Sequence, residues 1–103
     1  MTLSELKTYK NKGEKITCLT AYDASFAKLF DACGVDIILV GDSLGNVIQG
    51  GENTLNVSMN DMVYHTNAVV QGIDTALLIS DMPYQSYNNA EQTLENAQLL
   101  IQA

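Results

Sequence analysis

A chain of 103 residues has room for one small domain. Apolar residues make up 47% of the sequence and charged residues 17%, which is enough apolar material for a packed core and too little charge for a disordered chain. The net charge of −7, with five lysines and no arginine, argues against nucleic acid or an anionic membrane surface as a partner, because both bind through basic side chains.

The first predicted elements are a short helix and a strand. Thr2 and Glu5 have the spacing of a capping box, which predicts a helix that runs to about Lys10. Residues 11–13, Asn-Lys-Gly, would end this helix. Residues 16–20 are rich in β-branched side chains, which is typical of a strand.

A second helix is predicted after residue 24. Asp23 suits its N-cap, and Gly34 suits the position after its C-cap. Its larger apolar residues recur at helical spacing and are expected on one face: Phe26, Leu29, Phe30 and Cys33. Residues 37–40 then form a continuous apolar run, which is typical of a parallel strand covered on both faces.

Residues 41–57 are glycine-rich and show no periodicity, so we expect a long loop that is functional or disordered. Ser58 and Asp61 form a second capping-box pattern, which starts a helix that Gly72 would close. The apolar stripe of this helix consists of Met59, Met62, Val63, Thr66, Val69 and Val70.

The last predicted elements are a strand over residues 76–79 and a helix capped by Asn89, with Gln92 three residues on. The expected buried face of that helix consists of Ala90, Leu94, Ala97 and Ile101. Strand followed by helix, three times in succession, predicts an α/β fold with a parallel sheet and right-handed crossovers.

An aspartate follows each predicted strand closely: Asp23, Asp42 and Asp81. Ligands of parallel α/β folds bind beyond the carboxyl ends of the strands, and neighbouring strands lie about 4.8 Å apart, so we expect Asp42 and Asp81 to converge. Two close carboxylates repel unless a proton or a cation lies between them, and oxygen ligands favour Mg²⁺. Helix capping is the alternative role, and it suits Asp23 better, because the next predicted helix starts sixteen residues after Asp42.

Several segments together resemble the ketopantoate hydroxymethyltransferase family. The central one is Val40-Gly41-Asp42-Ser43-Leu44-Gly45. Others, in matching order, are residues 20–23 (TAYD), 25–30 (SFAKLF), 47–50 (VIQG), 53–55 (NTL), 64–66 (YHT) and 80–84 (SDMPY). The resemblance covers about residues 5–103.

This resemblance implies a (β/α)₈ TIM barrel of the phosphoenolpyruvate-mutase type. Such a barrel needs about 250 residues, so the chain would supply an N-terminal helix and the first three βα units. Residues 1–103 are therefore expected to be the N-terminal part of a single, incomplete domain. The first and third strands would keep unpaired edges, and we expect the chain alone to be unstable, oligomeric or aggregated.

The resemblance also implies an activity. The family transfers a hydroxymethyl group from 5,10-methylenetetrahydrofolate to 3-methyl-2-oxobutanoate, which gives 2-dehydropantoate of pantothenate biosynthesis. Asp42 and Asp81 match Mg²⁺ ligands, and Ser43 joins them in contacting the 2-oxo acid. In that mechanism Mg²⁺ stabilises the enolate formed when carbon 3 loses a proton. The glycine-rich segment 41–57 would close over the site.

No catalytic residue is expected within the chain. The resemblance places the general-base glutamate, a third metal-site glutamate and a substrate-binding lysine beyond residue 103. Glu91 and Glu95 lie on the outer helix and do not replace them. The family forms homo-oligomers, commonly decamers. The amino terminus lacks the order of a signal peptide, so we expect a cytoplasmic location.

The remaining candidates for functional residues are a histidine, two cysteines and three tyrosines, and most of them can be explained by structural roles. His65 is expected to be a hydrogen-bonded structural residue on an outer helix, away from the strand ends. Cys18 and Cys33 are expected to be small buried residues rather than nucleophiles. Tyr22 lies near the expected site, where substrate contact and packing are both open roles. Tyr84 and Tyr87 lie in the loop after the third strand and border the same end.

The sequence leaves two alternatives to the transferase open. One is another Mg²⁺-dependent 2-oxo acid enzyme of the phosphoenolpyruvate-mutase and isocitrate-lyase group. Asp42-Ser43-Leu44-Gly45 and Asp81-Met82-Pro83 favour the hydroxymethyltransferase over that group. The other is a non-catalytic fragment that associates with other chains, which the absent general base supports.

Overall fold

Three parallel strands form the centre of the molecule. The computed structural model describes residues 1–103, and its strands are β1 (Cys18–Thr20), β2 (Ile37–Val40) and β3 (Leu77–Ser80), paired in that order. Both pairings are parallel, with Ile38 between Leu19 and Leu78 in register. The predicted α/β class and parallel sheet are confirmed, and each strand lies within two residues of its predicted bounds.

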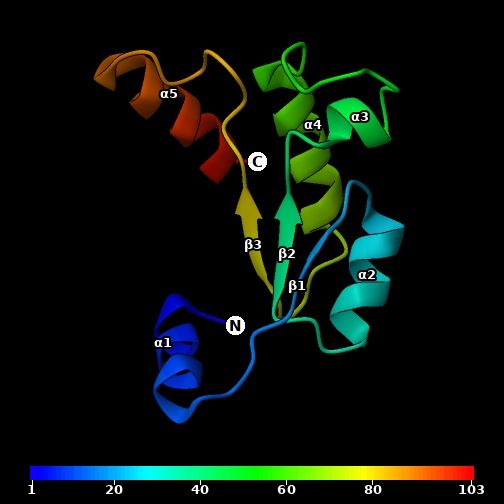
Figure 1. The fold of residues 1–103 in the computed structure, drawn as a ribbon, viewed down its shortest axis with the longest axis vertical. Helices are drawn as coiled ribbons and strands as arrows, with labels where there is room; N and C mark the ends of the chain where they lie inside the picture. The colour runs from blue at the N-terminus through cyan, green and yellow to red at the C-terminus, as the bar shows by residue number, and fades with distance from the viewer.

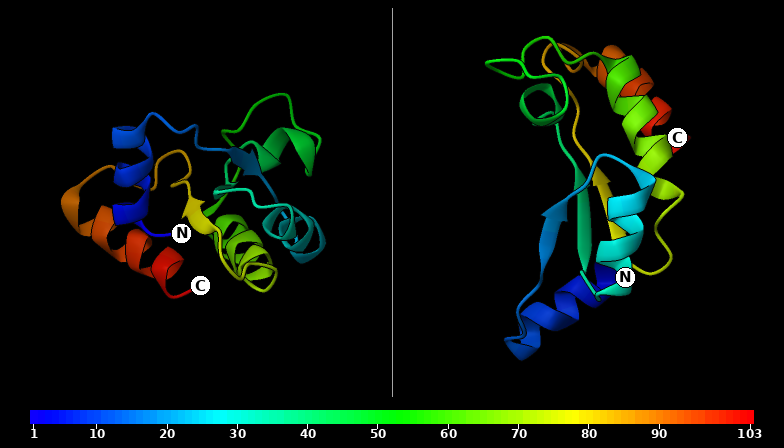
Figure 2. Two further views of the ribbon diagram at one scale, coloured as in Figure 1. Left: turned by 90° about the horizontal axis from the view of Figure 1, so that it is seen from below. Right: turned by 90° about the vertical axis from the view of Figure 1, so that its right-hand side faces the viewer.

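Five helices accompany the sheet. They are α1 (Leu3–Lys12), α2 (Ala24–Ala32), α3 (Leu44–Val47), α4 (Met59–Val70) and α5 (Ala90–Ile101). Figures 1 and 2 show α2, α4 and α5 on one face of the sheet, with α4 between the other two and in contact with both. Helix α1 lies at the end of the sheet where the strands begin (Figure 1). None of these helices is both long and apolar enough to span a lipid bilayer.

Both predicted capping boxes are present. At the start of α1, the backbone N–H of Glu5 donates to Thr2 Oγ1 over 3.2 Å, and the Thr2 N–H donates back to the Glu5 carboxylate over 2.7 Å. At the start of α4, Ser58 and Asp61 exchange the same two bonds, each 3.0 Å long. Each box satisfies backbone N–H groups that a helix start leaves without partners.

The other helix ends also follow the sequence signals, with one difference. Asp23 caps α2 and Asn89 caps α5, each through its side chain. Gly34 follows α2 with a φ of 85°, which favours glycine. Gly72 follows α4 without a left-handed φ; a methyl group there would lie 2.4 Å from the Ala24 carbonyl oxygen. Glycine is needed at this position because α2 passes so closely.

The sheet is covered by helices on one face only, which corrects the expectation for residues 37–40. Ile38 and Val40 point toward the helices and are fully buried, whereas Ile37 and Leu39 point to the other face and are half-buried. The core consists of Ala21, Ala27, Ile38, Val40, Leu44, Val57, Met62 and Val69. It therefore lies between β2 and the helices α2 to α4.

The predicted buried face of α5 is wrong, and the apolar face of α2 is largely exposed. On α2 the buried residue is Ala27, while Phe26 and Leu29 are 55% and 54% exposed. On α5 the side chains of Leu94 and Ile101 are 63% and 81% exposed. Periodicity places apolar residues on a face but does not identify what covers it, and nothing within residues 1–103 covers these faces.

Two further expectations need correction. Residues 41–57 are not loop throughout, because α3 forms within them, directly after β2. A helix of four residues is too short to leave a periodic signal. Cys18 and Cys33 are exposed free thiols rather than buried residues.

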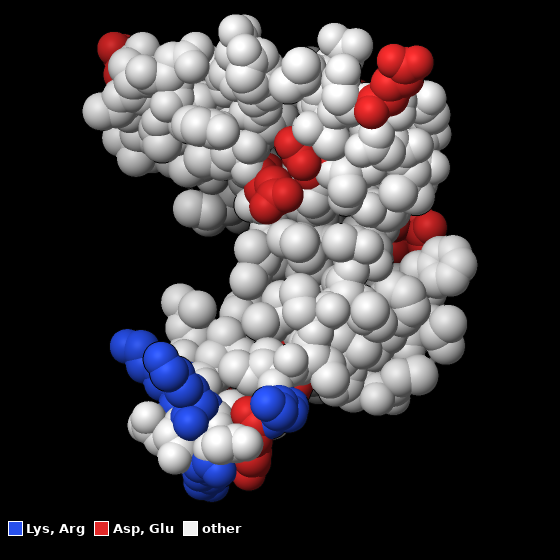
Figure 3. Space-filling model, in the orientation of Figure 1, with Lys and Arg blue, Asp and Glu red and all other residues white.

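Charge is unevenly distributed over the molecule. All five lysines lie within residues 1–28, and nine of the twelve acidic residues lie beyond them. Figure 3 shows lysine side chains gathered at the end of the molecule that carries α1, with some acidic side chains beside them. Other acidic side chains lie in a hollow level with the ends of β2 and β3. The two ends of the sheet therefore differ in electrostatic character.

Candidate metal and ligand site

The carboxyl ends of β2 and β3 bring Asp42 and Asp81 together, as predicted. The ladder continues past the strands, because the Asp81 N–H donates to the Val40 carbonyl over 2.9 Å. The Asp42 N–H then donates to Asp81 Oδ2 over 3.3 Å in a partly buried position. Two acidic residues from neighbouring strands thus share one small volume.

Gly41 keeps this volume open. It is buried, and a methyl group in place of its hydrogen would lie 3.1 Å from Asp81 Oδ2 and 3.3 Å from Ser43 Oγ. The absence of a side chain at Gly41 therefore brings a carboxylate and a hydroxyl to the same point. Ser43, the third predicted site residue, lies at this edge of the sheet with Asp42 and Asp81.

Asp42 has no capping role, although a helix starts close to it. Helix α3 begins at Leu44, two residues after Asp42 rather than the predicted sixteen. Its N-cap is Ser43, and no side-chain hydrogen bond caps it. Asp23, by contrast, accepts the Phe26 N–H over 2.7 Å and is a helix cap, as its position suggested.

Tyr22 belongs to the same edge of the sheet. It lies two residues past β1, and its hydroxyl is 2.7 Å from Ser43 Oγ. Its backbone carbonyl accepts a hydrogen bond of 2.7 Å from His65 Nδ1. His65 is thus hydrogen-bonded as predicted, but the expectation that it lies away from the strand ends is wrong. Sequence periodicity places His65 on the flank of α4 and carries no signal for this contact.

The side chains present suit Mg²⁺. Asp42, Asp81 and Ser43 offer oxygen atoms only, which is the donor chemistry of hard cations. The only ion pair in residues 1–103 joins the Met1 amino group to Glu5, so no basic side chain neutralises the two aspartates. No third carboxylate, histidine or cysteine joins them to complete a metal cluster. A metal ion held by this pair would therefore need further ligands from elsewhere.

The segment after α3 folds back on α3 and is joined to the start of α4. Asn46 donates to the Gly51 carbonyl over 2.9 Å, and the Gln49 amide donates to Asp61 Oδ2 over 3.0 Å. The Ser58 N–H and the Gln49 amide hold the pKa of the Asp61 carboxyl below its ordinary value of 3.8. The charged form of Asp61 thereby ties this segment to the start of α4.

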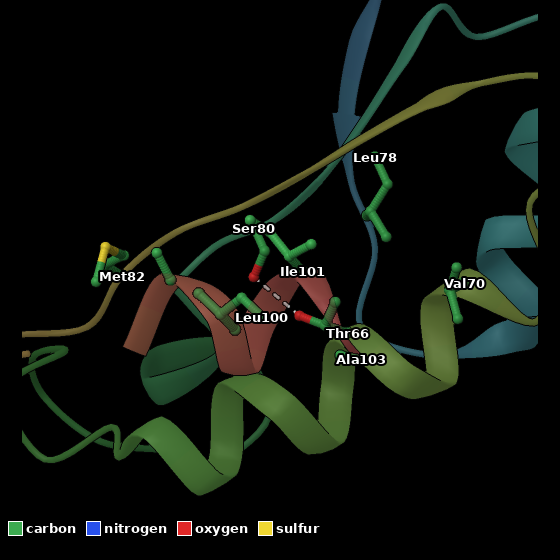
Figure 4. A pocket seen from close by; sticks show the side chains of 9 residues that line it. Thr66, Val70, Leu78, Ser80, Met82, Leu100, Ile101 and Ala103 are labelled. Carbon is green, nitrogen blue, oxygen red and sulfur yellow. Dashed lines mark hydrogen bonds between the residues drawn. The ribbon is translucent and has the colours of Figure 1, made fainter. Parts of the chain in front are cut away.

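A hollow of about 380 Å³ lies elsewhere, between β3, α4 and α5 (Figure 4). Its lining is mostly apolar and includes Leu78, Leu100 and Ile101. The hydroxyls of Thr66 and Ser80 are its main polar groups, and they hydrogen-bond to each other over 2.8 Å. No buried side-chain polar atom there lacks a hydrogen-bond partner, whereas the aspartate pair offers carboxylate oxygens, so the candidate site is the aspartate pair.

Fold and site together define a parallel α/β protein that carries paired carboxylates beyond the carboxyl ends of two adjacent strands. Comparison with known families identifies it further. The family described as ketopantoate hydroxymethyltransferase matches residues 1–103, and the chain belongs to that family.

Similar proteins carry the name 3-methyl-2-oxobutanoate hydroxymethyltransferase. The one from Ruthia magnifica is 73% identical over 101 residues, which are 98% of this chain and 39% of that protein. The one from Vesicomyosocius okutanii is 70% identical over the whole chain and 40% of its own length. The one from Shewanella piezotolerans is 55% identical over the whole chain and 39% of its length. The chain thus spans about two-fifths of the length of these curated relatives.

Proposed function

We propose that the chain forms the metal-binding part of an enzyme that transfers a hydroxymethyl group from 5,10-methylenetetrahydrofolate to 3-methyl-2-oxobutanoate. The observation that carries the proposal is the convergence of Asp42, Ser43 and Asp81 at one edge of the parallel sheet. Family membership and the names of the relatives support the reaction. The 2-oxo acid would bind at this edge, with the folate as co-substrate.

Each of the three residues has a role that its chemistry suits. Asp42 and Asp81 would hold Mg²⁺ through carboxylate oxygens on two adjacent strand ends. The Ser43 hydroxyl would donate a hydrogen bond to the carboxylate of the 2-oxo acid. A bound Mg²⁺ would supply positive charge that stabilises the negative charge developing on the keto oxygen as carbon 3 loses its proton.

The rest of the machinery is proposed to lie outside residues 1–103. A (β/α)₈ barrel of the phosphoenolpyruvate-mutase type would add five more βα units, and the general-base glutamate, a further metal-site glutamate and a substrate-binding lysine would come from them. The uncovered face of the sheet and the unpaired edges of β1 and β3 support this arrangement. The cytoplasmic location, the homo-oligomer and the closing of segment 41–57 over the site remain predictions.

Calorimetric titration with 3-methyl-2-oxobutanoate, with and without Mg²⁺, tests the site. In the intact protein, Asp42→Ala combined with Asp81→Ala should weaken the Mg²⁺-dependent binding more than about 100-fold, because both metal ligands are lost. Glu91→Ala combined with Glu95→Ala is the matched control, since it removes two exposed acids from α5 and should leave binding unchanged. Mg²⁺-dependent binding that survives in the aspartate double variant would rule out this metal site.

A further inference from the structure

Tyr22 connects helix α4 to the candidate site through two short hydrogen bonds. Its hydroxyl lies 2.7 Å from Ser43 Oγ, and its backbone carbonyl lies 2.7 Å from His65 Nδ1. Both contacts are partly buried, and each joins residues more than twenty positions apart in the sequence. Three elements of the fold, α4 and the segments after β1 and β2, therefore meet through one tyrosine.

The direction of the His65 bond follows from its chemistry. A backbone carbonyl only accepts hydrogen bonds, so His65 Nδ1 carries the proton and donates it. Both the Nδ1-protonated neutral ring and the imidazolium meet this requirement. The contact therefore fixes the backbone of Tyr22 in either charge state of the ring.

The direction of the Tyr22–Ser43 bond follows from the ligand of the proposed function. Geometry alone allows either hydroxyl to donate. The carboxylate of a 2-oxo acid only accepts, so Ser43 must turn its own proton toward that ligand. Ser43 Oγ then accepts from the Tyr22 hydroxyl. Each donor in such a chain is polarised by the one before it, which strengthens the final bond to the carboxylate.

We infer that Tyr22 and His65 are positioning residues for Ser43: the Tyr22 hydroxyl aims the Ser43 proton at the ligand carboxylate, and His65 fixes the tyrosine backbone. The inference rests on the proposed function, because it takes the 2-oxo acid as the ligand. According to this inference, Tyr22 acts through its hydrogen bond to Ser43 and does not contact the substrate. His65, on an outer helix, likewise affects ligand binding.

Steady-state kinetics of the intact protein test the role of Tyr22. Tyr22→Phe keeps the ring and removes one hydrogen bond, so KM for 3-methyl-2-oxobutanoate should rise about fivefold while kcat changes less than about twofold. If Tyr22 acts through Ser43, the same substitution should change KM less than about twofold in a Ser43→Ala background. Tyr9→Phe on α1 is the matched control and should leave both constants unchanged.

A second pair of variants tests His65. His65→Asn places an amide N–H group near the position of the ring Nδ1, whereas His65→Leu leaves no donor. His65→Leu should raise KM for the 2-oxo acid about threefold, and His65→Asn should restore it to near the wild-type value. Loss of thermal stability without a change in KM would indicate a merely structural histidine. A long-range proton–nitrogen NMR spectrum should show His65 Nδ1 protonated, with the signal identified by its absence from His65→Leu.

The outcomes separate this inference from the proposed function. Wild-type protein without hydroxymethyl transfer would overturn both. Active wild-type protein whose KM is unaffected by Tyr22→Phe would overturn the inference alone. A full effect of Tyr22→Phe in the Ser43→Ala background would mean that Tyr22 contacts the substrate itself, which also contradicts the inference. If His65 Nδ1 is unprotonated, the part of the inference that concerns His65 is wrong.

Discussion

At the scale of single residues, Gly41 sets the dimensions of the site. Its backbone conformation is open to any residue, since its φ is outside the left-handed region. Space is what favours glycine: Asp81 Oδ2 lies 3.1 Å and Ser43 Oγ 3.3 Å from the point that a methyl group would occupy. An alanine would require these oxygen atoms to shift by a few tenths of an ångström.

We expect Gly41→Ala to weaken Mg²⁺-dependent binding of 3-methyl-2-oxobutanoate about tenfold, in line with the displacement of a group that supports a metal ligand. The free energy of unfolding should change by less than about 1 kcal/mol, because the side chains that must move are not packed in the core. Titration calorimetry and urea unfolding measure the two quantities. Gly34→Ala should show the opposite pattern, since its φ of 85° makes alanine cost about 1 kcal/mol at a position remote from the site. Unchanged binding in Gly41→Ala would contradict this account.

The aspartate pair was predictable from the sequence, because a residue just past a parallel strand lies at the carboxyl end of the sheet. Asp42 and Asp81 lie just past apolar runs, and the carboxyl ends of parallel strands meet at one edge. Ser43 was expected at the site from the family resemblance and not from its position alone. The link from Ser43 through Tyr22 to His65 was not predictable in the same way. It depends on where the flank of α4 lies relative to the end of β1, which only tertiary packing decides.

At the scale of elements, Asp31 joins the end of α2 to the chain that enters β3. Its carboxylate accepts the backbone N–H groups of Asp74, Thr75 and Ala76 and the Thr75 hydroxyl. Burial raises the pKa of Asp31, but the N–H groups of Ala76, Thr75 and Asp74 and the Thr75 hydroxyl outweigh it and hold the pKa below 3.8. The ionised form is therefore favoured in the folded state.

A lowered pKa in the folded state makes the stability depend on pH in a known direction. The contribution of Asp31 is complete above its ordinary value of 3.8 and is lost as the pH falls through its lower folded value. Asp31→Asn should reduce the free energy of unfolding by about 1 to 2 kcal/mol at pH 7 and by progressively less at lower pH. Urea unfolding at a series of pH values measures this. Thr75→Val removes only one of the four donors and should cost less; an Asp31→Asn loss that is the same at pH 7 and pH 3 would contradict the assignment.

Helices and strands were predictable where residues close in sequence determine them, and were not predictable where tertiary packing determines them. The capping boxes of Thr2 and Ser58 depend on residues three apart, and both formed as expected. Helix α3 was missed because four residues carry no period. The buried face of α5 was misjudged, because Leu94 is exposed, and on α2 it is the small Ala27 rather than Phe26 that packs on the core. Hydrophobicity indicated which side chains burial would stabilise, but not which of them are buried in the fold.

At the scale of the whole molecule, large apolar side chains remain on the surface of several elements. Phe26 and Leu29 on α2 and Leu94 and Ile101 on α5 are each more than half exposed, and Ile79 on β3 is 40% exposed. The strands β1 and β3 also keep unpaired outer edges. Exposed apolar surface of this extent favours association, while the net charge of −7 opposes it.

We therefore expect residues 1–103, expressed alone, to self-associate in a concentration-dependent way. Sedimentation velocity should show species larger than a monomer of 11.2 kDa, and their fraction should rise with added salt, which screens the repulsion between negatively charged chains. Leu29→Lys combined with Leu94→Lys should shift the distribution toward monomer while the circular dichroism keeps its helical signal, because both side chains are exposed. Lys28→Arg leaves the apolar surface and the charge unchanged and should associate as the wild type does. A monomer at all concentrations, with a cooperative thermal transition, would show instead that three βα units form a stable structure despite these uncovered faces.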